Sequence, residues 1–306
     1  MIPELEAFVR GQTNDSSGTW SFIMLHNGYG YRNPKVSFIA FKDGHPNSFL
    51  KTVRYPKDNS VIARAHDRLV QVNESASHGA TSFEIPQALW CASLGEVFVS
   101  AETIVSGHPL DVKNKSDVNT VLDQIEAFGL QRRDGSYGEG EVDILFHQLV
   151  EESRLSEKGL LDSLNHLYQR VKDYAAGEEV GLDRMRAHGD ANPGNLLVAE
   201  GGRIAVVDWD RYADIEMPLF DVLTLMERTM SSDVNFISIY HERLERFVLA
   251  LKKTDRILPL LVFFYALLTD WRKREHYLPW EGPLLDEILQ KHVEETMERV
   301  RQVYPF

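Results

Sequence analysis

The sequence predicts an α+β fold with two lobes, in which a small, mainly antiparallel β lobe at residues 1–105 precedes a larger, mainly helical lobe at residues 106–306. Two observations favour this division. Residues 20–105 contain short β-prone runs that are separated by turn residues, as in antiparallel sheets. Further along, apolar residues recur at three- and four-residue spacing, as in helices with one buried face. Hydrophobic residues make up 43% of the 306 positions, which is enough to build substantial cores.

Three short runs near the start of the chain predict strands of the small lobe, and they are Trp20–Leu25, Lys35–Phe41 and Ser48–Val53. The turn after the first run contains Gly28 and Gly30. Glycine lets backbone amides approach an anion closely, so both glycines are candidate nucleotide-binding residues. Asn-Gly is also a common hairpin turn, and this plainer interpretation of the same segment stays open.

Helices are predicted for much of the remaining chain. Asp58-Asn59-Ser60 is a candidate N-terminal cap for a helix that continues to about Val72. Further runs with helical spacing are 118–128, 141–155 and 160–176, followed by three near 233–253, 256–275 and 283–303. Residues 132–140 are rich in glycine and charge, and they predict a flexible connecting loop.

A set of polar residues on two turns suits magnesium-dependent phosphoryl transfer. His188, Asp190 and Asn195 have the His-x-Asp-x4-Asn spacing of the protein-kinase catalytic loop. Asp208 follows a predicted β-hairpin at residues 196–207. An acidic side chain can accept the proton of an attacking hydroxyl group, while carboxylate and amide oxygens are suitable ligands for Mg²⁺. We therefore predict that Asp190 is the catalytic base and that Asn195 and Asp208 bind the metal.

At these residues the chain resembles the aminoglycoside phosphotransferase and choline kinase family, which is related to the protein kinases. The family's loop is His-Gly-Asp-x-His-Pro-Gly-Asn, and residues 188–195 match it except that Asn192 replaces the second histidine. Val207-Asp208-Trp209-Asp210 fits the family's metal turn. The resemblance implies a bilobal protein-kinase-like fold with Mg²⁺ as cofactor. It also implies transfer of the γ-phosphate of ATP or GTP to a hydroxyl group of an aminoglycoside, sugar, amino alcohol or similar metabolite.

The same resemblance implies further nucleotide-binding residues in the small lobe. Phe49-Leu50-Lys51-Thr52-Val53 is similar to the family's third strand, whose lysine binds the α- and β-phosphates. The family's acidic partner of that lysine lies on the next helix, where Ala65 occupies the best-matching position and Asp67 and Glu74 are the alternatives. Residues 96–110 resemble the linker whose backbone binds the base, and they make Ala101 and Thr103 candidates. The plainer interpretation of residues 96–110 is a buried edge strand.

Composition limits the partners of the protein. A formal net charge of −13 argues against nucleic-acid binding, which requires a basic surface. An acidic cleft would concentrate a cationic substrate, with Glu141 and Glu216 among the candidate residues, although solubility explains the same charge. The chain has one cysteine and no predicted signal peptide, so a cytoplasmic location is expected. The apolar run at residues 257–269 is too short to span a membrane.

Two alternative functions stay open on the sequence. A catalytically silent nucleotide-binding module would be consistent with the incomplete glycine pattern and with the missing acidic partner of Lys51. A glycosyltransferase could use Asp208-Trp209-Asp210 as its metal motif, but the early part of the chain has no alternating strand-helix pattern for a nucleotide-sugar domain.

Overall fold

The computed structural model divides the chain into two compact units. One contains Met1–Phe128 and His188–Ile215, and the other contains Gly129–Ala187 and Glu216–Phe306. The structure describes residues 2–14, 17–27, 34–77, 83–137, 141–144, 146–147, 158–175, 182–212, 216–217, 219–230, 242–243, 245–246, 248–249 and 298. The predicted catalytic segment, residues 188–208, belongs to the same unit as the N-terminal sheet, so these units do not divide at residue 105. The functional division into a nucleotide lobe and a substrate lobe stays a prediction.

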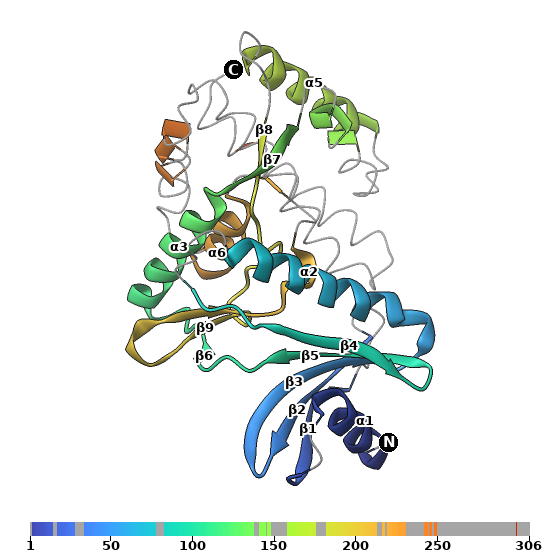
Figure 1. The fold of residues 1–306 in the computed structure, drawn as a ribbon. Helices are drawn as coiled ribbons and strands as arrows, with labels where there is room; N and C mark the ends of the chain where they lie inside the picture. Colours follow the sequence, from blue (N-terminus) through green and yellow to red (C-terminus); the bar gives the residue numbers. More distant parts are fainter. Residues whose placement is uncertain are drawn as a thin grey trace. The chain divides into compact units, whose positions relative to one another are not determined.

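The first unit contains a five-stranded antiparallel sheet with the strand order β1-β2-β3-β5-β4 (Figure 1). The strands are β1 (Trp20–Asn27), β2 (Lys35–Lys42), β3 (His45–Val53), β4 (Ala88–Leu94) and β5 (Val97–Thr103). The three predicted strands are therefore confirmed. The interpretation of residues 96–110 as an edge strand is wrong, because β5 lies between β3 and β4 and pairs with both.

Alternation along the strands gives the sheet two different faces. One face packs against α1 (Ile2–Thr13), a helix that the sequence analysis did not predict. This core contains Leu5 and Val9 of the helix, which are one turn apart, together with buried residues of every strand except β4. The buried positions of β2 are Val36, Phe38 and Ala40, so the residues between them face the opposite side of the sheet.

Helix α2 (Asn59–Ser77) lies on this opposite side of the sheet, across from α1 (Figure 1). Its buried residues are Ile62, Ala65, Leu69 and Val72, at the spacing of one helical face. Asn59 fastens its first turn to the β4–β5 hairpin, since its Nδ2 donates to the Glu96 carbonyl (2.8 Å) and its Oδ1 accepts from the Phe98 amide (2.9 Å). The predicted helix is confirmed and extends beyond Val72.

A second, three-stranded sheet carries the catalytic segment. Its strands are β6 (His108–Pro109), β9 (Leu196–Val198) and β10 (Ile204–Val206), in the order β10-β9-β6. The predicted hairpin is confirmed by the pairing of Ile204 with Val198. Glu84 joins the other edge of β10, because its amide donates to the Ile204 carbonyl (2.8 Å) and its carbonyl accepts from the Val206 amide (2.9 Å). These bonds connect the hairpin to the chain that leads into β4.

The second unit is described in part. Its strands β7 (Arg132–Tyr137) and β8 (Leu182–Met185) form an antiparallel pair, so the predicted loop at 132–140 is wrong over most of its length. The glycine-rich segment has little strand propensity of its own, and it pairs with a strand that is distant in the sequence. The predicted helices at 118–128 and 160–176 are confirmed as α3 (Lys115–Gly129), which is almost entirely in the first unit, and α5 (Lys158–Ala175).

Helix α6 (Phe220–Met230) carries the buried Asp221 in its first turn. The helices predicted near 233–253, 256–275 and 283–303 fall almost entirely outside the described residues, as does the second half of 141–155. Over the part of the chain that is described, no helix combines the length and the apolar character that would be required to cross a membrane.

Candidate functional site

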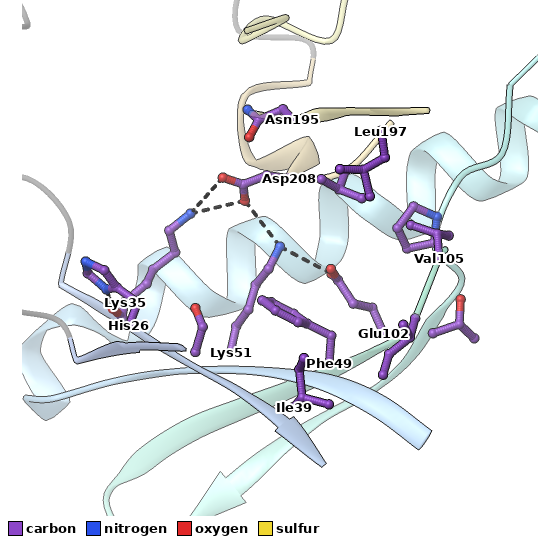
Figure 2. A pocket seen from close by; sticks show the side chains of 15 residues that line it. His26, Lys35, Ile39, Phe49, Lys51, Glu102, Val105, Asn195, Leu197 and Asp208 are labelled. Carbon is purple, nitrogen blue, oxygen red and sulfur yellow. Dashed lines mark hydrogen bonds and ion pairs between the residues drawn. The ribbon is translucent and has the colours of Figure 1, made fainter. Parts of the chain in front are cut away.

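A cavity of about 420 Å³ lies in the first unit (Figure 2). Its residues from β2 and β3 are on the sheet face opposite α1. Its wall is formed by alternate residues of β2 and β3, by the end of β5 and the residues after it, and by the catalytic segment. The lining residues are His26, Lys35, Ser37, Ile39, Phe49, Lys51, Pro86, Glu102, Thr103, Ile104, Val105, Asn195, Leu197, Val207 and Asp208. Lysines and carboxylates therefore share one cavity with a group of apolar side chains.

Lys51 lies at the centre of the charged part of the cavity. Its Nζ is 3.2 Å from Glu102 Oε2, 3.2 Å from Asp208 Oδ1 and 3.5 Å from Asp210 Oδ1. Burial alone would lower the pKa of the Lys51 ammonium, but Glu102, Asp208 and Asp210 outweigh it and hold the pKa above its ordinary value. Lys51 is therefore a buried cation held by three acidic side chains.

The acidic partner of Lys51 comes from β5 and not from α2. The candidates on that helix, Asp67 and Glu74, are exposed, and Ala65 is buried. Glu102 pairs with Phe49 in the sheet register and lies on the same face as Lys51, two residues along β3. The prediction that the acidic partner of Lys51 lies on the helix after β3 is wrong. Glu102 was assigned to the linker and was not considered as that partner. The strand parity of β3 and β5, once paired, would have brought Glu102 to the cavity.

A second lysine, which the sequence analysis missed, contacts the same carboxylates. Lys35 Nζ is 3.2 Å from Asp208 Oδ1 and also forms an ion pair with Asp210. Lys35 is the first residue of β2, and its carbonyl accepts a bond from His26 Nδ1 (2.7 Å), which therefore carries the proton. Strand alternation was the available signal, because Lys35 lies two residues before Ser37 and therefore on the same face of β2.

Asp208 lies in a turn that hydrogen bonds and ring contacts of its neighbours hold in place. Its backbone is left-handed (φ 62°, ψ 60°), a conformation that Asp tolerates better than most residues. On either side of it, the Val207 amide donates to the Asn195 carbonyl (2.9 Å) and Trp209 Nε1 donates to the Val206 carbonyl (2.8 Å). Trp209 is almost fully buried, and its ring packs against Phe83, Phe128, His188 and Tyr212. The turn therefore presents the carboxylate at a defined position.

The two lysines set the charge of Asp208. Burial alone would raise the pKa of this carboxyl group, but the ammonium groups of Lys51 and Lys35 outweigh it and hold the pKa well below its usual range. Burial also raises the pKa of Glu102, against the opposing effect of Lys51. Asp208 is thus ionised at neutral pH, as a metal ligand must be.

Hydrogen bonds within the catalytic loop orient Asp190. His188 Nε2 donates to the Val207 carbonyl (2.9 Å), and its Nδ1 accepts from the Asp190 amide (3.2 Å). Asp190 Oδ2 accepts from the side-chain amides of Asn192 (3.2 Å) and Asn195 (3.3 Å). Asn192, the departure from the family's loop, thus helps to hold the predicted base.

Gly189 is required by this loop, because its φ is +82° and an added Cβ would lie 2.3 Å from the carbonyl oxygen of Arg211. We expect Gly189→Ala to lower the free energy of unfolding by about 2 to 4 kcal/mol, from backbone strain and steric overlap together. Gly201 is a matched control, since its φ is +79° but an added Cβ meets nothing within 4 Å. Chemical denaturation should show a smaller loss for Gly201→Ala. Equal losses would show that the contact with Arg211 does not constrain the loop.

The remaining predicted nucleotide-binding residues differ in where they lie. Gly28 and Gly30 fall outside the described residues. Ala101 is buried in the core that packs against α1, so its side chain faces away from the cavity. Thr103 lines the cavity, but its amide donates to the Gln87 carbonyl (2.9 Å) and its hydroxyl accepts from the Gln87 amide (2.8 Å). Ile104 and Val105, which follow it, also line the cavity.

The donor set at the charged wall fits Mg²⁺. Asp208 and Asn195 both line the cavity, and Figure 2 shows the Asn195 amide oxygen on the side of Asp208. The Asn195 Nδ2 donates to the Asp190 carbonyl (3.0 Å), so the Asn195 Oδ1 is the side-chain atom that could bind a metal ion. Among the described residues there is no group of three or more His, Cys, Asp or Glu side chains that could hold a metal ion. Mg²⁺ typically takes one or two protein oxygens and completes its shell with phosphates and water, and Asp208 and Asn195 could supply those two oxygens.

Two of the acidic residues that were candidates for a cationic-substrate surface, Glu141 and Glu216, form ion pairs within the second unit. Arg184 Nη1 is 2.9 Å from Glu216 Oε2, and Arg184 Nη2 is 3.1 Å from Glu141 Oε1. Both carboxylates thus have a cationic partner within the protein, which reduces their capacity to bind a cationic substrate.

Comparisons with known proteins identify the family and the fold. A family model described as the phosphotransferase enzyme family matches residues 64–257. A comparison with curated proteins finds no significant match. Among solved structures, aminoglycoside phosphotransferase APH(4)-Ia is similar with a TM-score of 0.60 and 14% identity, over 98% of this chain and 99% of that chain. Choline kinase LicA from Streptococcus pneumoniae has a TM-score of 0.53 and 14% identity, over 97% and 99%.

A complex of an aminoglycoside 2'-phosphotransferase-IIIa mutant with GDP is also similar, with a TM-score of 0.54 and 15% identity over 97% of this chain and 95% of that chain. At these identities the likeness establishes the fold. The predicted α+β, protein-kinase-like fold is confirmed by these neighbours.

Proposed function

We propose, from the premise that the chain belongs to the phosphotransferase enzyme family, that it is a magnesium-dependent kinase of small hydroxylated molecules. Its donor would be ATP or GTP, and its acceptor an aminoglycoside, sugar, amino alcohol or similar metabolite. One observation carries this proposal: the hairpin and the catalytic loop bring Asn195 and Asp208 to the same cavity as Lys51, with Asp190 bonded to Asn195. This is the set of groups that phosphoryl transfer requires.

Each residue has a separate part in the proposed reaction. Lys51 would bind the nucleotide phosphates, with Glu102 holding the ammonium group in place. Asp190 would accept the proton of the acceptor hydroxyl group. The hydroxyl oxygen would form a bond to the γ-phosphorus while the bond from that phosphorus to the β–γ bridging oxygen breaks, and the nucleoside diphosphate leaves. Asn195 and Asp208 would hold Mg²⁺, which supplies neutralisation of the phosphate charge when it is bound.

The class of donor and acceptor is supported by what the neighbours bind. Structures of APH(4)-Ia variants contain hygromycin B with ADP or with AMP-PNP, and the aminoglycoside 2'-phosphotransferase-IIIa mutant contains GDP. The net charge of −13 also favours a cationic acceptor such as an aminoglycoside. We therefore place aminoglycosides first in the acceptor class and treat ATP and GTP as equal candidates for the donor.

The proposal is tested by a phosphate-transfer screen with purified protein, Mg²⁺, and ATP or GTP labelled at the γ-phosphate. The acceptor panel should contain aminoglycosides, amino alcohols, sugars and nucleosides. Labelled product with at least one acceptor, which disappears when Mg²⁺ is chelated, is the expected result. Nucleotide-dependent thermal stabilisation without transfer to any of these acceptors would favour the silent nucleotide-binding module. One of the two reasons for that alternative no longer applies, since Lys51 has an acidic partner in Glu102.

Glu102→Gln should weaken nucleotide binding by about tenfold, because it removes a charge-assisted bond that holds Lys51 while it preserves side-chain shape. The dissociation constant of AMP-PNP with Mg²⁺ measures the effect, and thermal unfolding without nucleotide checks the fold. Glu96→Gln is the control, since Glu96 is exposed at the β4–β5 turn. If Glu102→Gln binds like the wild type while Lys51→Met does not bind, Glu102 has no part in positioning the lysine.

A further inference from the structure

Lys35 lines the cavity together with Lys51. We propose that Lys35 is a second phosphate-binding residue, which contacts the terminal phosphate of the bound nucleotide while Lys51 contacts the phosphates nearer the ribose. This inference rests on the proposed nucleotide site and assigns an additional residue to it.

The register of the sheet orders the cavity-facing residues into rows. Ile39 pairs with Phe49, Ser37 pairs with Lys51, and Lys35 pairs with Val53. Successive rows are two residues apart, which is roughly 7 Å along a strand. Lys35 is therefore one row beyond Lys51, on the side away from Ile39 and Phe49. Figure 2 shows the same order, with Lys35 and Val105 at opposite ends and Lys51 between them.

The two ends of the cavity suit the two ends of a nucleotide. Ile39, Phe49, Ile104, Val105 and Leu197 provide an apolar end, which is the environment that a planar base prefers. A nucleotide extends in a fixed sequence from base to ribose to phosphates. With the base among the apolar residues, the phosphate chain passes Lys51 first and extends towards Lys35.

Lys35 is also placed beside the predicted metal ligand. Its side chain is 15% exposed, and its Nζ is 3.2 Å from Asp208 Oδ1, the same distance as Lys51 Nζ. Asp208 and Asn195 would hold Mg²⁺, which would neutralise phosphate charge at this wall, so the terminal phosphate is expected close to Asp208 and within reach of Lys35.

Acidic side chains outnumber the lysines at this wall by one. Two lysines, Lys35 and Lys51, face three carboxylates, those of Glu102, Asp208 and Asp210. Before Mg²⁺ binds, the loss of Lys35 would raise the excess of negative charge at this wall from one to two, which would disfavour the approach of a polyphosphate.

The competing explanation is that Lys35 is a counterion of Asp208 and has no contact with nucleotide. The two explanations differ in what the loss of the ammonium group would change. If Lys35 contacts the terminal phosphate, its loss weakens the binding of a nucleotide with three phosphates more than the binding of one with two. A counterion affects all nucleotides alike, and its removal would free Asp208 and strengthen Mg²⁺ binding.

The test compares nucleotides of different length on Lys35→Met in the full chain, by calorimetry with Mg²⁺ present. We expect the dissociation constant of AMP-PNP to rise by about 10- to 100-fold, as for the loss of one charge-assisted bond, while that of ADP changes little. Lys51→Met should weaken both nucleotides. Lys35→Arg should recover most of the AMP-PNP affinity. Lys42→Met is the matched control, because Lys42 ends the same strand and does not line the cavity.

Equal weakening of AMP-PNP and ADP, or tighter Mg²⁺ binding with no change for nucleotides, would overturn the proposal. Should Lys35→Met fail to fold, amine acylation of the wild-type protein read by mass spectrometry gives the same comparison. AMP-PNP should then protect Lys35 more strongly than ADP does, and equal protection would overturn the proposal. These binding readouts do not require an acceptor. A phosphate-transfer screen that fails would therefore count against the kinase function and leave the subsite to be judged separately.

Discussion

Replacing Asp190 by Asn is expected to reduce the turnover number by about 10²- to 10⁴-fold, the usual contribution of a positioned general base. The amide retains an oxygen that can accept from Asn192 and Asn195, so the loop should keep its fold. It cannot take up the proton of the acceptor hydroxyl at neutral pH. Nucleotide binding should persist, because Lys51 and Asp208 are unchanged.

The measurement combines steady-state kinetics, on an acceptor found in the screen, with the dissociation constant of AMP-PNP in the presence of Mg²⁺. Asp173→Asn serves as control, since it makes the same chemical change at an exposed position of α5. A natively folded Asp190→Asn variant with wild-type turnover would remove Asp190 from the reaction and with it the assignment of the loop.

Replacing Asp208 by Asn is expected to reduce turnover by about 10²-fold or more and to remove the dependence of nucleotide binding on Mg²⁺. The carboxylate is the strongest candidate ligand for the metal, and its ionised form is favoured by the ammonium groups of Lys35 and Lys51. A neutral amide would leave those two cations close together and would bind Mg²⁺ weakly. The test is a titration of Mg²⁺ at a fixed nucleotide concentration, with activity and nucleotide affinity both recorded.

Asp210→Asn provides a matched comparison for that experiment. Asp210 is two residues away and also pairs with Lys35 and Lys51, but among these two aspartates Asp208 lines the cavity. The Arg68 guanidinium donates to the carbonyl of Asp210, a backbone contact that the substitution retains. A smaller loss is expected for Asp210→Asn. A larger loss than for Asp208→Asn would make Asp210 the principal metal ligand.

The parts of the fold that follow from local signals could be predicted. Strands β1, β2 and β3, helices α2, α3 and α5, and the β9–β10 hairpin were expected near their observed positions. Each is encoded by alternation, helical spacing or turn residues within a short stretch. Of the missed segments, α1 has a helical spacing at Ile2, Leu5 and Val9 that was overlooked, whereas the glycine-containing β7 has a weak local signal for a strand. Both are stabilised by partners elsewhere in the chain, the sheet core for α1 and β8 for β7.

The candidate site divides in the same way. The spacing of His188, Asp190 and Asn195, and the turn at Asp208, are local, so the sequence by itself determined the proposed chemistry and the family that it resembles. The acidic partner of Lys51 and the second lysine were decided by the tertiary structure. Glu102 and Lys35 reach the cavity because β2, β3 and β5 pair in one register, and shifting that register by a single residue would turn their side chains to the opposite face. Strand pairing is a long-range property, and a short stretch of sequence does not carry it.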